Sequence, residues 1–374
     1  MFYKQIKFWK KDNILRIKKI ILKNMKKVLV WLSGWVDSAV TAYLLKEAGY
    51  DVTAGFMINY LDENNPVCPT KLDLQVAKEV AAYLNIPFFT FDYRETYAEK
   101  VLDYMYEWYK KGITPNPDIM CNSEVKFRVF LDEALEHGFD MIATGHYAII
   151  EKWTDNLFHL KKWIDNTKDQ SYFLAWLNQF QLSKALFPVW NMQKSEVREI
   201  ALKAWLPNAL RKDSQWICFV WKVDMVKFLE QKIEHKRGLV KDTSWKILGE
   251  HKWIFYYTIG QRKWLDIWGQ SEPIFVVKKD IENNEIIVWT SSDLELYDDK
   301  LFVNNMFFLA KNDYVFPLIA KAKIRYRQED QDCIIYKEDN RFVVEFTQKQ
   351  RAITSWQICA IYLDDELIMS WVIK

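Results

Sequence analysis

Glycine is scarce in this chain. Only 10 of the 374 residues are Gly, whereas ordinary usage of roughly 7% would give about 26. Tryptophan is abundant instead, with 18 copies. Tight turns and phosphate-binding loops often need backbone with φ > 0, which Gly adopts without steric cost. A chain with many loops and so little Gly must therefore place other residues at such positions.

Other absences narrow the class of protein. None of the five Cys forms a CxxC motif, which argues against a zinc knuckle, and the five His suggest no metal site. No apolar run approaches the roughly 18 residues that a membrane helix needs. The net charge is only +2, so any nucleic-acid site must be a local patch. Without a secretory signal, the expected compartment is the reducing cytoplasm.

The length of 374 residues, with 50% apolar and 27% charged residues, predicts a soluble globular protein of two or three domains. Residues 1–26 carry nine Lys or Arg and one acid. This stretch could be a basic arm for RNA. We favour a disordered or wrongly included leader, because Met25-Lys26-Lys27 followed by a strand looks like a natural start.

Strands and helices alternate in the first half of the chain. Strands are predicted at 28–32, 51–58, 87–91 and 140–143, and helices at 37–48, 72–84, 97–111 and 123–137. This pattern predicts an α/β domain with a Rossmann-like parallel sheet and helices on both faces. Ligands of such sheets bind outside the carboxyl ends of the strands, where residues 33–38, Met57, Gly145 and His146 fall. A second helical region is predicted from 171 to about 206.

The second half of the chain has a different texture. After a helix near 223–232, short strands are predicted at 254–257, 274–277, 285–288, 301–303, 320–326, 333–336, 342–346, 357–363 and 367–373. They indicate a small β-rich domain followed by a closed C-terminal β-barrel. The expected divisions are a leader (1–26), a nucleotide-binding domain (27–215), a central domain (216–290) and the barrel (291–374).

The stretch VLVWLSGWVDS, residues 28–38, has the pattern of a strand, a tight loop and a helix N-terminus. Such a loop directs backbone N–H groups at an anion. Ser33 and Ser38 add hydroxyl donors, and Asp37 is suited to cap the helix or to orient a metal. Trp35 does not fit, because an indole cannot provide the close backbone approach that Gly allows.

Two cysteines stand in polar, turn-forming surroundings. Cys121 follows the proline-fixed turn TPNPDIM, at the start of the helix predicted from 123, where a helix N-terminus lowers a thiol pKa. The alternative is an ordinary helix start with a buried Cys. Cys218 lies in a loop, and two such thiols suit sulfur transfer, in which one carries sulfur and the other resolves the product. Cys68 falls in a loop, and Cys333 and Cys359 are expected in the barrel core.

Three segments are candidate RNA contacts. Lys168-Asp169-Gln170 precedes an aromatic helix start, and the alternative is helix capping by Asp169 or Ser171. The sequence KIRYR, residues 323–327, would alternate basic residues on one strand face; a solvated face is the alternative. The basic turn at 257–263 could be a third contact. His146 is expected to line the nucleotide pocket, and the other four His to lie on the surface.

Together these motifs resemble a known family. SGxVDS after a strand resembles the PP-loop of N-type ATP pyrophosphatases. TPNPDIMCN, ATGHYA, KDQSYFL, KDSQ-x-ICF, YTIGQRK-x-L and KIRYR, in this order, resemble the bacterial tRNA-specific 2-thiouridylases, from about residue 27 to the C-terminus. The resemblance implies an ATP- and Mg²⁺-dependent enzyme that thiolates the wobble uridine of tRNA. It also implies a sulfur donor protein, either a cysteine desulfurase or a relay protein.

The resemblance also implies roles for individual residues. The ATP site would comprise Trp31, Leu32, Ser33, Gly34, Trp35, Val36, Asp37, Ser38, Met57 and Gly145. The target uridine would meet Asn116, Pro117 and Asp118. Other tRNA contacts would be Lys168, Asp169, Gln170, Arg325 and Tyr326. Cys121 would be the nucleophile, and Cys218 would carry the persulfide.

The implied chemistry is consistent with these residue types. The uridine 2-carbonyl is a poor electrophile, and adenylation of its oxygen creates a leaving group. Cys218 would deliver sulfur from its persulfide, as hydrosulfide or through a base-bound intermediate. Attack of Cys121 on the persulfide would leave a Cys121–Cys218 disulfide to be reduced. The target base would have to be flipped out of the anticodon stack.

Tryptophan stands where the family pattern has glycine at fourteen positions. These are Trp31, Trp35, Trp163, Trp190, Trp205, Trp216, Trp221, Trp245, Trp253, Trp264, Trp268, Trp289, Trp356 and Trp371. Genuine substitution does not select one residue type in this way, because each site would force an indole into a turn or a close contact. We hypothesise that the source organism reads UGA as glycine, and that the sequence was translated with UGA as tryptophan.

Two other functions fit parts of the sequence. Another adenylating ligase with a PP-loop would not need the paired cysteines. An RNA-binding protein with an inactive nucleotide loop becomes the alternative if Trp35 is real, because an indole there should abolish ATP binding.

Overall fold

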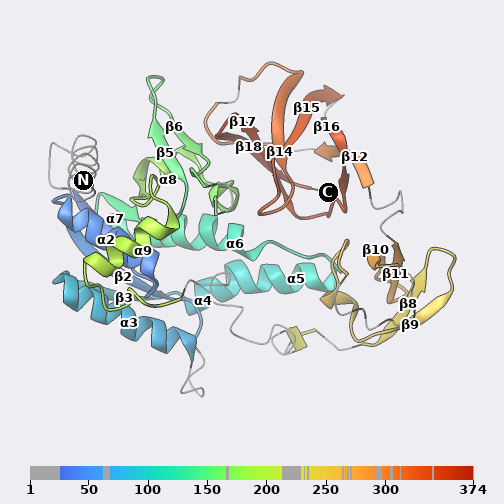
Figure 1. The fold of residues 1–374 in the computed structure, drawn as a ribbon, viewed down its shortest axis with the longest axis horizontal. Coiled ribbons are helices and arrows are strands. Elements are labelled where there is room, and N and C mark those ends of the chain that lie inside the picture. Colours follow the sequence, from blue (N-terminus) through green and yellow to red (C-terminus); the bar gives the residue numbers. More distant parts are fainter. Residues whose placement is uncertain are drawn as a thin grey trace, which may run out of the picture.

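A computed structural model describes residues 26–61, 68–165, 168–212, 229–230, 232–233, 236–262, 265, 267, 269, 272–290, 297–303, 306–311, 313–338 and 341–373. All but the last residue of the predicted leader lie outside these ranges, as do Cys218 and most of the helix predicted at 223–232. The described strands form three sheets (Figure 1).

The first sheet is parallel throughout and has the strand order β3-β2-β1-β4-β7. Its strands are β1 (Lys27–Trp31), β2 (Asp51–Ile58), β3 (Phe88–Asp92), β4 (Met141–Ala143) and β7 (Ala185–Leu186). The four predicted strands are confirmed to within one residue at each end. The fifth, β7, has only two residues and was missed, because so short a strand carries no periodic signal.

Helical segments connect the strands of this domain, and some of them cover the two faces of the sheet. They are α2 (Val36–Glu47), α3 (Pro69–Leu84), α4 (Arg94–Tyr97), η1 (Ala98–Asp103), α5 (Tyr104–Lys110), α6 (Pro117–Met120), η2 (Cys121–Val129), α7 (Phe130–Glu136), η3 (Ser171–Leu174), α8 (Gln179–Lys184) and α9 (Lys194–Lys203). Successive side chains of a strand point to opposite faces. Leu29 and Trp31 therefore join the core with η2 and α7, whereas Val28, Val30 and Leu32 join the core with α2, α3 and α9.

One continuous helical segment, α6–η2–α7, runs from Pro117 to Glu136. The helix predicted from 123 thus begins six residues earlier, and the prediction that Cys121 stands at its start is wrong. Pro117 occupies the first helical turn, where its missing N–H costs nothing, and the Asn116 side chain accepts a hydrogen bond from the Ile119 N–H at 3.4 Å. Pro117 is therefore the first residue of the helix, and not part of a turn that precedes the helix.

The central domain contains a four-stranded sheet of order β10-β11-β8-β9. Its strands are β8 (Gly238–Asp242), β9 (Ile247–His251), β10 (Ile274–Asp280) and β11 (Glu285–Thr290). The strand predicted at 254–257 is wrong, because this segment forms the 3₁₀ turn η5 (Ile254–Tyr256). Ile254 and Tyr257 are both buried in the core of this domain, and residues three apart share a face in a 3₁₀ turn.

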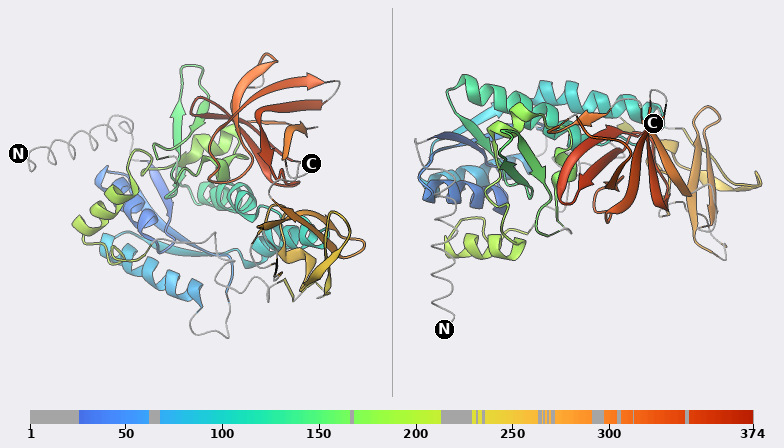
Figure 2. Two further views of the ribbon diagram at one scale, coloured as in Figure 1. Left: turned by 45° about the vertical axis from the view of Figure 1, so that its right-hand side comes forward. Right: turned by 90° about the horizontal axis from the view of Figure 1, so that it is seen from above.

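The C-terminal strands wrap around a separate apolar core. They are β12 (Tyr297–Val303), β13 (Phe307–Phe308), β14 (Leu318–Lys323), β15 (Gln331–Glu338), β16 (Arg341–Arg351), β17 (Ile358–Leu363) and β18 (Glu366–Val372). A hairpin of the first domain, β5 (Ile149–Lys152) and β6 (Phe158–Lys161), extends the same sheet through pairing of β6 with β18. The first domain and the barrel are therefore joined edge to edge (Figure 2).

The histidines are more buried than the sequence indicated. His159 and His251 are each 1% exposed, so the prediction that they lie on the surface is wrong. The His159 ring bridges Glu366 and Asp155, which lets a polar side chain enter the core. No helix in the described part of the chain is long and apolar enough to cross a membrane.

Three tryptophans occupy left-handed backbone positions. Trp205, Trp245 and Trp356 have φ values of 54°, 66° and 70°. Trp205 follows α9, and the hydrogen bonds Leu206 N–H to Ala201 O and Trp205 N–H to Leu202 O close a Schellman motif around it. Glycine is the usual residue at this position. These conformations support the hypothesis that glycine belongs at such positions.

Candidate active site

The loop between β1 and α2 has the backbone of an anion-binding turn. Gly34 has φ 82°, and a Cβ atom there would lie 2.5 Å from the Asp73 carbonyl oxygen, so only glycine fits. The Ser33 N–H donates to Ser38 Oγ at 3.1 Å, and the two hydroxyl oxygens are 3.0 Å apart. Residue 35 precedes the first turn of α2, and its side chain caps no N–H group of the helix.

Asp37 on the first turn of α2 is held by two groups from elsewhere in the fold. Its carboxylate accepts from Lys194 Nζ at 2.5 Å and from the Tyr147 hydroxyl at 2.6 Å. Lys194 was missed by the sequence analysis, because a lone lysine at a helix start carries no local signal. These contacts tie the start of α2, and with it the loop, to the N-terminal residue of α9.

Arg211 is a second cation at the loop that the sequence analysis missed. Its guanidinium donates to the Gly34 carbonyl oxygen at 2.9 Å, pairs with Asp73 and covers the Trp35 ring at 3.9 Å. Asn208 donates to the same carbonyl at 3.0 Å. The basic segment after α9 thus fixes the peptide that must carry φ > 0.

The other predicted nucleotide-site residues lie at the same end of the sheet. A Cβ atom on Gly145 would come within 2.9 Å of the Asp37 backbone, so this residue abuts the start of α2. Met57 is fully buried at the end of β2. His146 is also buried, its Nδ1 lies 2.6 Å from Thr144 Oγ1, and burial together with the nearby Lys126 lowers its pKa. The structure therefore brings Gly145, Met57 and the loop together.

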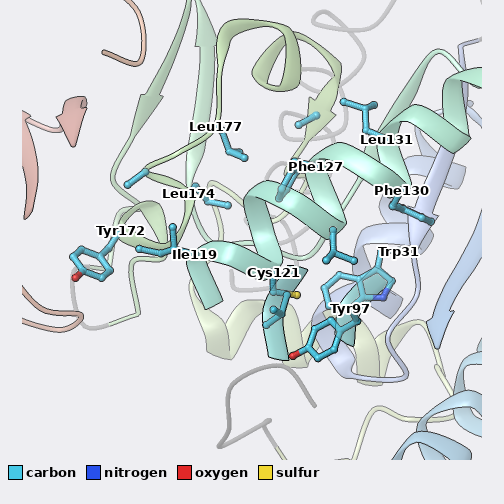
Figure 3. Close-up of a cluster of buried hydrophobic side chains, with 14 of the residues drawn as sticks. Trp31, Tyr97, Ile119, Cys121, Phe127, Phe130, Leu131, Tyr172, Leu174 and Leu177 are labelled. Atoms are coloured by element: carbon cyan, nitrogen blue, oxygen red, sulfur yellow. The ribbon is translucent and has the colours of Figure 1, made fainter. Parts of the chain in front are cut away.

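Cys121 is 1% exposed and lies in the same core cluster as Trp31 and Tyr97. Figure 3 shows the three side chains in one part of this cluster, with η2 above them. Because Cys121 is the fifth residue of the helical segment, the influence of the helix terminus on its thiol is weak, since the dipole acts mainly within the first turn. What distinguishes this cysteine is its position in the same core cluster as Trp31, the last residue of β1.

The proline-rich loop before Cys121 is clamped by both β-domains. The Thr114 hydroxyl lies 3.0 Å from the hydroxyl of Thr258 in the central domain. Gln357 of the barrel donates to the Thr114 carbonyl at 2.8 Å. Asn116, Pro117 and Asp118 follow directly, so their position depends on contacts more than 140 residues away. No local pattern in the sequence could have shown this.

Lys168, Asp169 and Gln170 face different ways. Lys168 is exposed. Asp169 is 4% exposed and accepts hydrogen bonds from the Ser171 N–H and hydroxyl at 3.1 and 2.8 Å. The alternative of helix capping by Asp169 or Ser171 is wrong, because Gln170 occupies the N-cap of η3 and no side chain caps this helix. Lys323 of the barrel lies 3.7 Å from it. Gln170 accepts from the Tyr147 N–H at 3.0 Å.

The predicted basic strand face at 323–327 is wrong. Strand β14 ends at Lys323, which is buried, and Arg325 and Tyr326 lie in the turn that follows. Arg325 donates to the carbonyls of Arg351 and Ala352. The Tyr326 ring lies 4.2 Å from Phe173 of the first domain. The segment therefore reaches the nucleotide-binding domain, although it is not a strand there.

The described residues contain no group of three or more His, Cys, Asp or Glu that could hold a metal ion. Cys218, the predicted persulfide carrier, lies outside the described residues.

Comparison with known proteins decides the family. Residues 26–222 match the model of the tRNA methyl transferase HUP domain, residues 217–290 the tRNA methyl transferase PRC-barrel domain, and residues 298–373 the aminomethyltransferase beta-barrel domain. The tRNA-specific 2-thiouridylase MnmA of Shouchella clausii is 44% identical over 350 residues, covering 93% of this chain and 96% of that one. The MnmA of Christiangramia forsetii is 41% identical, covering 94% and 100%.

The chain belongs to the tRNA-specific 2-thiouridylase family.

Within the 2-thiouridylase family the three matches follow the three sheets, except that the β5–β6 hairpin of the first match pairs into the C-terminal sheet. The first match covers the parallel sheet and the β5–β6 hairpin, the second covers β8 to β11, and the third covers β12 to β18 except for the first residue of β12. The U34-tRNA thiolase NcsA from Methanococcus maripaludis shows a distant likeness, with 18% identity and a TM-score of 0.38 over 60% of this chain and 73% of that one.

Proposed function

We propose that this 2-thiouridylase family member replaces the 2-oxygen of the wobble uridine in tRNA with sulfur, using ATP, Mg²⁺ and a sulfur donor protein. One observation carries the proposal beyond family membership. The end of β1, which opens the nucleotide loop, and Cys121 of η2 face the same core on one side of the sheet. Activation at the loop and sulfur chemistry at Cys121 can therefore act on one base.

The backbone of the loop fits a nucleotide phosphate. Gly34 supplies the left-handed turn, and the first turn of α2 presents N–H groups and the positive end of a helix dipole. The side chains of Trp31 and Trp35 do not fit, because they fill the space beside this backbone. Asp37 is engaged by Lys194, and Mg²⁺ commonly binds through one or two carboxylates and the phosphates of its nucleotide.

When bound, ATP would supply the adenylyl group that converts the uridine 2-oxygen into a leaving group, with release of pyrophosphate. We assign to Cys121 the attack on the persulfide of Cys218. A disulfide forms between the two Sγ atoms, the Cys218 S–S bond breaks and hydrosulfide departs. Hydrosulfide adds at C2 of the base and AMP leaves, and an external dithiol reduces the disulfide to restore both thiols.

The proposed RNA contacts surround the clamped loop. Asn116, Pro117 and Asp118 would meet the target base after it leaves the anticodon stack. Lys168, Gln170, Arg325 and Tyr326 would contact the RNA around it. We propose that Asp169 does not contact the RNA itself. It is buried, and its ion pair with Lys323 of the barrel holds the segment that carries Lys168 in place.

The test is a thiolation assay with the full chain, made with Gly at the fourteen Trp positions. The reaction contains a tRNA transcript with a wobble uridine, ATP, Mg²⁺ and a cysteine desulfurase supplied with ³⁵S-cysteine. We expect labelled tRNA with this chain and with Cys333→Ser, and none with Cys121→Ser. Cys333 is a matched control, because it is 2% exposed in the barrel core and burial raises its pKa to about 12.

A transcript with cytidine at the wobble position should stay unlabelled. Full turnover by Cys121→Ser would contradict the proposal and favour another adenylating ligase with a PP-loop.

A further inference from the structure

Four charged side chains are buried together where the barrel meets the first domain. Lys162 follows β6 and Asp169 precedes η3, whereas Lys323 ends β14 and Asp330 directly precedes β15. The first three are at most 5% exposed, and the side chain of Asp330 is 24% exposed. Each domain thus contributes one lysine and one aspartate to what we call the buried charge cluster.

Each lysine of the buried charge cluster faces a carboxylate of the other domain. Lys162 Nζ donates to Asp330 Oδ2 at 2.5 Å, and Lys323 Nζ lies 3.7 Å from Asp169 Oδ2. Lys323 Nζ also lies 3.6 Å from Asp330 Oδ1, which connects the two pairs. The ring of Tyr362 lies against both cations, with its centre 4.2 Å from Lys162 Nζ and 5.5 Å from Lys323 Nζ. The charges balance across the domain boundary, so the cluster is complete only when the two domains are docked.

The buried charge cluster holds both ends of one short turn of the barrel. Lys323 is the residue before the segment 324–329 and Asp330 is the residue after it, and each pairs with the first domain. The turn is also braced internally, because the Ile324 N–H donates to Gln328 Oε1 at 2.8 Å. A segment that is fixed at both ends and braced within has one position relative to the first domain.

This turn lies beside the loop that we propose to meet the target uridine. The Tyr326 ring is 4.2 Å from the ring of Phe173, which belongs to η3. Burial is the main cause that raises the pKa of Tyr326, and the carboxylates of Asp169 and Asp118 add to it. Asp118 belongs to the uridine loop, residues 116–118. An RNA that contacts the turn is therefore held next to that loop.

Charges are a costly means of joining two domains. Removing an ion from water costs several kcal/mol, and apolar side chains of similar volume often stabilise a buried site as well or better. A buried ion pair differs from an apolar contact in its response to displacement, because a small shift leaves a charge without its partner. The cluster therefore selects one docking position of the turn, and adds little to the overall stability.

We infer that Lys162 and Asp330 are positioning residues of the thiolation reaction. Together with Lys323 and Asp169 they hold the turn 324–329 in one place, so that RNA bound there presents its wobble base to the loop of residues 116–118. The inference rests on the proposed function and identifies what sets the geometry between two of its RNA-contacting segments. Neither residue touches the reacting atoms, and both act through the turn.

The first experiment examines the turn without ATP, sulfur donor or RNA. The parent is the full chain with Gly at the fourteen Trp positions. Lys162→Met/Asp330→Asn removes one cation and one anion and nearly keeps the size of both side chains. The matched control, Lys321→Met/Asp332→Asn, removes the exposed pair at 3.6 Å that joins β14 to β15 in the same barrel. Hydrogen–deuterium exchange with peptide mass spectrometry follows the amides of 324–329, and urea unfolding verifies that each chain is folded.

We expect these amides to exchange about tenfold faster in Lys162→Met/Asp330→Asn than in the parent, as for a segment that opens locally. The urea midpoint should change little, because the charges are removed as a pair, and the control should exchange like the parent. If the double variant does not fold, Asp330→Asn alone, which changes one partly exposed side chain, should show the faster exchange. Exchange at the parental rate in a folded variant would overturn the assignment.

The second experiment measures thiolation by the same chains. In Lys162→Met/Asp330→Asn, kcat should fall about tenfold or more, because a misplacement of about 1 Å can cost about 100-fold in rate. KM for tRNA should change little, since Arg325 and Tyr326 remain. Lys162→Arg, which keeps the cation, should retain most of kcat.

An unchanged kcat despite faster exchange, or an equal loss in the control, would overturn the positioning role. If the parent chain itself makes no thiolated tRNA, the proposed function fails, whereas the exchange result still decides whether the buried charge cluster fixes the turn.

Discussion

Replacement of Trp205 by glycine should stabilise the protein. Trp205 has φ 54° at the C-terminal end of α9, and a non-glycine residue costs about 1–2 kcal/mol in this conformation. Its side chain is 81% exposed, so truncation removes little buried apolar surface. Glycine loses roughly 0.5–1 kcal/mol more in backbone entropy on folding, and the net gain should be about 0.5–1 kcal/mol.

The comparison with alanine isolates the backbone effect. Trp205→Ala also removes the indole but keeps the strain of a Cβ atom at positive φ, so it should be less stable than Trp205→Gly by about 1 kcal/mol. For a domain of about 200 residues such a difference shifts the melting temperature by about 2–4 °C. Differential scanning calorimetry of the full chain measures this shift in the transition of the parallel-sheet domain.

Trp153 provides the matched control. It lies at the turn after β5, outside the positive-φ set, and its indole contacts His159 and Glu151. Trp153→Gly should therefore lower the melting temperature of the domain. The reasoning is refuted if Trp205→Gly melts below Trp205→Ala, or if Trp153→Gly gains as much as Trp205→Gly.

Three further predictions follow from buried contacts. Asp169→Asn should destabilise the chain by about 1–3 kcal/mol in urea unfolding, because it weakens the buried hydrogen bonds from Ser171 while Asp330 still lies 3.6 Å from Lys323. Asp332→Asn, which affects only an exposed pair, should cost less than about 1 kcal/mol. Burial lowers the pKa of His146 below 6.5, so the unfolded chain binds the proton first; the free energy of unfolding should fall as the pH drops below about 6.5, and His146→Asn should flatten this dependence in unfolding titrations. Gln357→Leu should lower kcat for thiolation about tenfold with little change in melting temperature, since it releases the Thr114 loop; unchanged kinetics would refute the clamp.

The tryptophan hypothesis has a direct genetic test. If the codons at positions 35, 216 and 264 are UGG, the hypothesis is wrong. Structure adds a second criterion, since it separates tryptophans by what their indoles do. Trp205, Trp245 and Trp356 adopt backbone that favours glycine, whereas Trp153 makes specific contacts. Trp153 should therefore prove to be a true tryptophan codon.

Much of the first domain could be predicted because its signals are local. Each strand of the parallel sheet is a short apolar run followed by a helical period, and parallel strands place their carboxyl ends together. This logic predicts from the sequence alone that Ser33, Gly34, Met57 and Gly145 lie at one edge of the sheet. The same logic failed at 254–257 and at 323–327, where an apolar or basic alternation belongs to a 3₁₀ turn and to the turn after β14.

The remaining parts of the site depend on distant contacts. The cations Lys194 and Arg211 reach the loop from more than 150 residues away, and the Thr114 loop is held by Thr258 and Gln357 from two other domains. Charged side chains at such positions look like ordinary surface residues in the sequence. Only packing shows which of them turn inward.

The sequence by itself determined the fold class, the family and the identity of the chemical groups, because strand–helix periodicity and ordered motifs are local properties of the chain. It also exposed the misplaced tryptophans through composition. The tertiary structure decided which groups meet. It placed Trp31 on the same face of β1 as Cys121 and Lys126, buried Asp169, and moved Arg325 and Tyr326 into a turn against the first domain. Such proximity arises from the crossing of chain segments far apart in sequence, which no local pattern encodes.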